Sequence, residues 1–155
     1  MINWAHVHLI INHIPVIGMI GAVLLLIYAI VRKSDEVRTI SFSLFVLIAM
    51  MAVAAYLTGE AAEKVVKNFP GVTEAYIGRH EEMGEYALVL MTLLGVASIV
   101  GLIIRYRTGS VPKCTLTIIL LMSIVVSVVV GITANLGGQI RHSEIRDKAP
   151  ATAMP

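Results

Sequence analysis

The sequence predicts an all-α integral membrane protein that folds as an up-down-up-down four-helix bundle. Of its 155 residues, 57% are hydrophobic and 14% are charged, and the mean hydropathy is +0.86. Soluble domains carry about 25% charged residues, so this chain is too apolar for a water-soluble globule. Its four apolar stretches each approach the roughly 20 residues that a helix needs to cross a bilayer. We expect one transmembrane domain over residues 1–155, with spans at about 8–31, 39–62, 82–105 and 114–136.

The connections between these spans follow from their turn-forming and charged residues. Pro15 stands where the first helix is expected to begin, a position that tolerates a residue without an N–H group. The charged run 32–36 separates the first two spans. The second helix is expected to continue through 60–66, and the Asn-Phe-Pro-Gly run at 68–71 then turns the chain back. The Gly- and Pro-containing run 107–112 separates the last two spans.

Basic residues in the two short loops predict the orientation of the chain. They are Arg32, Lys33 and Arg38 in the first loop, and Arg105, Arg107 and Lys113 in the second. In the long middle connection and the C-terminal tail, basic residues are diluted by acidic ones. The positive-inside rule weighs Lys and Arg in short loops. We therefore expect a bacterial inner (cytoplasmic) membrane protein with cytoplasmic short loops and periplasmic N- and C-termini.

All the histidines fall at one end of this bundle. In an up-down-up-down arrangement, the starts of the first and third helices and the ends of the second and fourth share one membrane face. Ionisable residues within a membrane bundle are costly and mark functional sites, although a single interfacial histidine is more often a polar anchor. We expect at least two of the five to bind haem or a metal. They are His6, His8, His13, His80 and His142.

The heights of these residues follow from the helical rise of about 1.5 Å per residue. Counted from the opposite membrane face, His6, His80 and His142 lie at similar heights near the interface. His13 lies about 10 Å deeper and shares a helix face with His6. His8 is expected to point away from that face.

Glycines accompany two of these histidines. Gly84 follows His80 by four residues, and Gly138 precedes His142 by four. Each glycine leaves space on the same helix face, one turn inward from the imidazole. A flat macrocycle bound through histidine needs such clearance, but small residues also line helix–helix contacts in membranes. The sequence gives the two interpretations about equal weight.

Haem b is the cofactor that this pattern favours. Imidazole is the usual axial ligand of protein-bound haem iron, and facing helices of a bundle supply it from the core. We expect one or two b-type haems near the periplasmic face, with His13 and His80 as the first ligand pair. His8 or His6 with His142 is expected to hold a second haem, if there is one.

A chain of this size has little room to bind a substrate alone. We therefore expect a non-catalytic electron-transfer subunit of a larger respiratory or redox complex. Its expected partners are other membrane or periplasmic redox subunits, a quinone or a periplasmic cytochrome, and the lipid bilayer. The net charge of +2 gives no indication of nucleic-acid binding.

Two other functions remain open at this point. One is a non-haem metal-binding or metal-transport protein that uses the histidines with Glu81, Glu82 or Met83. The other is a cofactor-free assembly subunit whose histidines are interfacial anchors. The di-iron bundle signature Glu-x-x-His does not occur in the sequence, and glutamates at this boundary more often form a solvated rim. The single Cys114 excludes a disulfide framework, a cysteine zinc site and c-type haem attachment.

Several short motifs resemble the DUF2231 family of small four-helix bacterial membrane proteins. Residues 8–16 read H-L-I-I-N-H-I-P-V and resemble the family's opening H-P-L-L-V-H-F-P-I, with both histidines and the proline in register. Residues 58–62 resemble its Thr-Gly-rich end of the second helix. His80 with Gly84 matches its histidine at the entry to the third helix. Residues 136–140 are similar to its Gly-Gly turn.

This resemblance implies a membrane bundle of the b-type cytochrome kind and carries the ligand role to His8, His13 and His80. The chain departs from the family pattern at two positions. Asn12 replaces an apolar residue, and His142 lies closer to Gly138 than the family's last histidine does. The ligand role is therefore not carried to His142.

Overall fold

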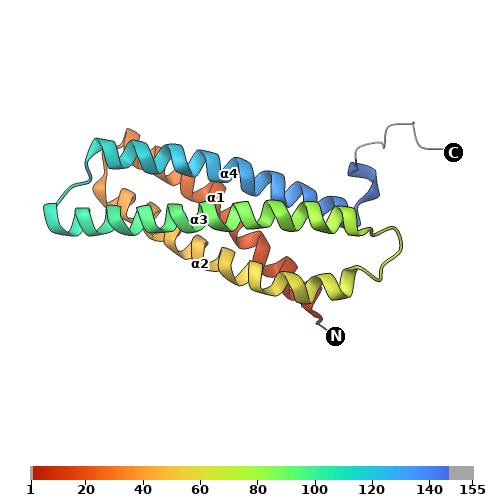
Figure 1. The fold of residues 1–155 in the computed structure, drawn as a ribbon. Helices are drawn as coiled ribbons and strands as arrows, with labels where there is room; N and C mark the ends of the chain where they lie inside the picture. Colours follow the sequence, from red (N-terminus) through yellow and green to blue (C-terminus); the bar gives the residue numbers. More distant parts are fainter. Residues whose placement is uncertain (1, 147–155) are drawn as a thin grey trace.

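The computed structural model describes residues 2–146, which form an antiparallel bundle of four long helices (Figure 1). Each of the four is long and apolar enough to span a membrane. The expected all-α membrane bundle is thus confirmed, and the helices run past the expected spans at nearly every end. The elements are α1 (Trp4–Val31), α2 (Asp35–Val66), α3 (Glu74–Thr108), α4 (Lys113–Arg141) and a short 3-10 helix, η1 (Ser143–Ile145).

The packing of the helices places them at the corners of a square. Within the described residues, α1 and α3 each pack against α2 and α4 but not against each other, so α1 and α3 lie on a diagonal. We call the end with the start of α1 and α3 and the end of α2 and α4 the terminal end (Figure 1). The opposite end, with the connections 32–34 and 109–112, is the loop end.

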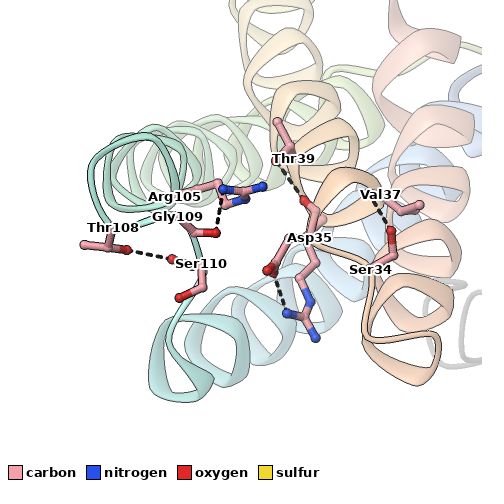
Figure 2. A network of polar contacts seen from close by, with 9 residues as sticks. Ser34, Asp35, Val37, Thr39, Arg105, Thr108, Gly109 and Ser110 are labelled. Carbon is pink, nitrogen blue, oxygen red and sulfur yellow. Dashed lines mark hydrogen bonds and ion pairs between the residues drawn. The ribbon is translucent and has the colours of Figure 1, made fainter.

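Polar contacts fix the two short connections at the loop end (Figure 2). The Ser34 side chain caps α2, and Asp35 pairs with Arg38 one turn later at 2.6 Å. α3 ends at Gly109, whose φ of 80° is the left-handed conformation that glycine adopts readily. The Arg105 side chain donates a hydrogen bond to the Gly109 carbonyl at 2.6 Å. These local bonds fix the backbone where α2 begins and where α3 ends.

The core of the loop-end half is filled by large side chains. Phe42, Phe45, Leu26 and Leu94 are at most 1% exposed. Small residues that lie between these large side chains let the helix backbones approach closely, as is common in membrane bundles. This half is therefore close-packed like the interior of a soluble protein.

α1 continues through Pro15, so the expectation that the helix begins there is wrong. In lipid, an irregular segment leaves several backbone groups unpaired, which costs more than the single hydrogen bond that proline removes. The residues before Pro15 are therefore helical. Pro15 follows His8 by seven residues, which is nearly two turns, so the two residues lie on the same helix face. α3 likewise begins at Glu74, so His80 lies nearly two turns inside a helix.

The close approach of α2 and α3 generates a stability prediction. A Cβ atom on Gly95 would lie 2.8 Å from the Ala49 Cβ, which is fixed to the α2 backbone. Gly95→Ala is expected to lower the free energy of unfolding by about 1–3 kcal/mol. Unfolding of the detergent-solubilised protein by SDS, followed by circular dichroism, measures the change.

Gly131→Ala is the matched control, because a Cβ at Gly131 would meet nothing within 4 Å. It is expected to leave the stability unchanged or raise it by up to about 1 kcal/mol, since alanine is the better helix former. Equal stability of the two variants would contradict the close α2–α3 contact.

Candidate functional site

A cavity of about 920 Å³ lies at the terminal end of the bundle and is lined by all four helices. Protein interiors are normally close-packed, so small side chains at successive core positions leave the space that large ones fill at the loop end. Its volume lies within the range of cofactor pockets, about 300–1,000 Å³. The small lining residues are Ala52, Ala55, Gly59 and Ala62 of α2, Gly84 and Ala87 of α3, and Ala134, Gly137 and Gly138 of α4.

His8 lines this cavity from α1 and is bonded to the neighbouring helix α2. Its Nδ1 lies 3.0 Å from the Ala55 carbonyl oxygen and 3.1 Å from the Thr58 hydroxyl. A carbonyl oxygen only accepts, so Nδ1 carries the proton and Nε2 keeps its lone pair. The Thr58 hydroxyl itself donates to the Ala55 carbonyl at 2.8 Å, which leaves its oxygen free to accept from His8. The ring therefore presents an unprotonated nitrogen.

His80 lines the cavity from α3 and is held in the same manner by α4. Its Nδ1 donates to the Thr133 carbonyl oxygen at 3.0 Å, which again leaves Nε2 as the basic nitrogen. The Thr133 hydroxyl donates back to the Met83 carbonyl of α3 at 3.2 Å. A Cβ on Gly137 would lie 3.0 Å from the His80 Cε1, so the absence of a side chain at Gly137 makes room for the imidazole.

The two imidazoles lie close together across the bundle. Their ring centroids are 6.4 Å apart and their planes are inclined by 86°. His8 and His80 come from the diagonal helices α1 and α3, and each is bonded to the helix that follows it in the chain. Neither Nε2 makes a hydrogen bond to any residue between 2 and 146. The arrangement is a pair of neighbouring imidazoles, each oriented by a backbone carbonyl of the adjacent helix.

The remaining histidines are exposed and bonded locally. His13 lies at the cavity wall, but its Nδ1 is hydrogen-bonded to the Leu9 carbonyl of its own helix. His6 is bonded to Asn3 at 3.0 Å. The ring that lies beside His80 is thus His8, whereas the sequence favoured His13 as its partner. His8 points away from the His6 and His13 face, as expected, and that direction leads into the bundle.

His142 belongs to the rim of the site. It is exposed and donates from Nδ1 to the Glu144 carboxylate at 2.9 Å. The pKa of the Glu144 carboxyl is lowered by its own backbone N–H and, next, by this bond from His142. Gly84 and Gly138 were predicted to leave space beside a histidine, but the glycine that makes room for the His80 ring is Gly137. A Cβ on Gly84 would meet nothing within 4 Å, and one on Gly138 would meet the end of the Ile145 side chain.

Sequence reasoning missed Gly137, Thr58 and Thr133. The spacing of buried residues along α1 and α3 does indicate that His8 and His80 lie on the core face of their helices. His8 precedes the buried Pro15 by seven residues, and His80 precedes the buried Ala87 by seven, so both continue the buried face of their helix.

Four acidic side chains also line the cavity. Glu60 and Glu63 line it from α2, and Glu81 and Glu85 line it from α3. Within residues 2–146, no three His, Cys, Asp or Glu side chains come close enough together to hold a metal ion. The His8 and His80 imidazoles therefore have no third protein ligand of these types in the part of the chain that the structure describes.

The fold and the site define a four-helix membrane protein with paired imidazoles in a cavity at one end of the bundle. The family model described as "predicted membrane protein (DUF2231)" matches residues 5–144, so the chain belongs to this family. The family resemblance drawn from the short motifs is thereby confirmed. No curated protein and no solved structure matches the chain.

The contact between Gly137 and His80 gives a prediction about ring orientation. Gly137→Ala is expected to push the imidazole away from the Thr133 carbonyl, because the added Cβ would lie 3.0 Å from Cε1. In protein labelled with ¹⁵N-histidine, the Nδ1 signal of His80 should shift. Gly138→Ala is the control, since its Cβ would meet only the flexible end of Ile145, and it should leave that signal in place. An unchanged signal in both variants would contradict the contact.

Proposed function

We propose that the cavity binds one b-type haem with His8 and His80 as axial ligands, and that the protein is the electron-transfer subunit of a larger membrane redox complex. The observation that carries this proposal is the pair of imidazoles on diagonal helices, each with Nδ1 bonded to a carbonyl and Nε2 free. The proposal is limited to one haem, because His13 and His142 are exposed and bonded locally.

The separation of the rings supports this assignment. With metal–nitrogen bonds of about 2.0 Å and ring centres about 1.15 Å behind the nitrogens, two imidazoles on opposite sides of one metal have centres roughly 6.3 Å apart. The centroids of His8 and His80 are 6.4 Å apart. Each ring can rotate about its own bond to a metal, so the 86° angle between the planes is compatible with this arrangement.

The number of protein ligands favours haem over a bare metal ion. A zinc site needs four ligands and usually draws at least three from the protein. A porphyrin supplies four nitrogens itself, so haem iron needs only one or two axial side chains. Two histidines in a cavity lined mainly by small and apolar residues are enough protein ligands for haem iron but too few for a zinc ion.

The surrounding residues tune the ligands. The carbonyl groups of Ala55 and Thr133 fix the tautomer of each imidazole and raise the basicity of its Nε2. A bound haem supplies a one-electron iron couple, and two axial histidines leave no position for a substrate on the metal. The site therefore suits electron transfer rather than catalysis on bound substrate.

The location of the cavity bears on the partners. It lies at the terminal end, which the basic residues of the two short loops predict to be periplasmic. We propose a bacterial inner-membrane protein with periplasmic N- and C-termini that exchanges electrons with other membrane or periplasmic redox subunits. A quinone or a periplasmic cytochrome is the donor or acceptor that fits this position.

Haem binding is tested on the protein purified in detergent. A low-spin absorption spectrum with a sharp α-band on reduction is expected, either as isolated or after titration with hemin. His8→Ala and His80→Ala should each lose the low-spin spectrum, because one axial ligand is gone, and the double variant should lose haem altogether.

His6→Ala is the matched control, an exposed histidine of the same helix end, and it should keep the low-spin spectrum. Retention of that spectrum in either the His8 or the His80 variant would reject this ligand pair. A metal ion bound without haem absorption would favour the non-haem alternative.

Orientation is tested with the cysteine of the chain. Cys114 is exposed at the loop end, next to the second short connection. A membrane-impermeant maleimide should label Cys114 only after spheroplasts are lysed. In a Cys114→Ser background, Ser143→Cys at the terminal end should be labelled in intact spheroplasts. The reverse pattern would place the cavity at the cytoplasmic face.

A further inference from the structure

The charges around the cavity are unevenly distributed. The four glutamates that line it all belong to α2 and α3. Among the described lining residues there is one Lys or Arg, Arg141, and it is the last residue of α4. The Arg141 side chain extends from the end of α4 to Phe69 in the α2–α3 connection, so its charge lies at the rim of the cavity.

Arg141 is held at the rim with its hydrogen-bond donors available. Its guanidinium carbon lies 4.8 Å from the centroid of the Phe69 ring, a cation–π contact that restrains the side chain. Its side chain donates no hydrogen bond and forms no ion pair within residues 2–146. A guanidinium has five N–H donors in a fork that matches a carboxylate.

The nearby Arg146, in contrast, uses its hydrogen-bond donors within the protein. Its Nε donates to the Gln139 carbonyl at 2.7 Å and its Nη2 to the Ile140 carbonyl at 2.9 Å, which caps the end of α4. It also stacks on the Tyr76 ring, 4.3 Å from the centroid, and does not line the cavity. The contrast identifies Arg141 as the cation available to a ligand in the cavity.

We propose that Arg141 binds the propionate carboxylates of the haem and thereby turns that edge of the macrocycle toward the rim of the cavity. This inference rests on the proposed function. A flat ligand held between His8 and His80 lies across the α1–α3 diagonal, so its edges point toward α2, toward α4 and along the bundle axis to the rim. Glu60 and Glu63 repel an anionic edge on the α2 side, whereas Arg141 attracts it at the rim.

The test compares two porphyrins that differ only in the charge of that edge. Hemin and hemin dimethyl ester are titrated into the wild-type protein and into Arg141→Gln, with the Soret band reporting binding. Arg141→Gln should bind hemin about tenfold more weakly, the size expected for one lost charge-assisted bond, and should bind the ester as wild type does. Arg141→Lys should recover part of the hemin affinity.

Arg79→Gln is the matched control, an exposed arginine of the terminal end that does not line the cavity, and it should change neither affinity. Glu63→Gln should strengthen hemin binding, or leave it unchanged, without affecting the ester. Equal hemin affinity in Arg141→Gln and wild type overturns the role of Arg141 and leaves the haem proposal standing. Equal weakening for both porphyrins indicates a structural role and also overturns it. If the wild type binds neither porphyrin, the proposed function itself fails.

Discussion

The site depends on two hydrogen bonds that cross between neighbouring helices, from the Nδ1 of His8 to the Ala55 carbonyl and from the Nδ1 of His80 to the Thr133 carbonyl. A buried N–H without a partner is costly, and each helical carbonyl has a second lone pair that can accept it. Each bond therefore offsets the burial of an imidazole and also fixes its tautomer. Each lies within one helical hairpin, α1–α2 or α3–α4, so every hairpin carries one ligand together with its own anchor. The pair forms when the two hairpins pack.

The two halves of the bundle differ in the size of the side chains that line their core. At the loop end, Phe42, Phe45 and Leu94 fill the core. At the terminal end, the same helix faces carry alanine, glycine and histidine, and they surround the cavity. Space left in a protein interior forfeits packing energy, so this half is less well stabilised than one filled with large side chains. That loss is expected at a site built to receive a ligand.

The sequence predicted the fold and the end at which the site lies, because hydropathy and charge report directly on helices in lipid. It did not predict which histidines lie next to each other. The sequence placed His8 away from the face of His6 and His13 but did not relate either face to the core, although the seven-residue spacing from His8 to Pro15 and on to Ala22 marks the buried face. Gly137 was harder to find. Its contact with His80 depends on how α3 and α4 are rotated against each other, and the sequence of either helix alone does not fix that rotation.

The position of the cavity restricts the electron-transfer role that we propose for this chain. All five histidines lie toward the terminal end, and the core between the cavity and the loop end holds apolar side chains together with the buried Ser41, Ser98 and Ser123. Under the proposed function, a single redox centre in the cavity therefore serves one membrane face and has no histidine between it and the loop end. The charged rim of glutamates and Arg141 lies on that same face, where an incoming partner meets it. Under the proposed function, an electron that reaches this site is returned to a partner on the same side of the membrane, which suits a subunit that passes electrons within a complex rather than one that carries them across the bilayer.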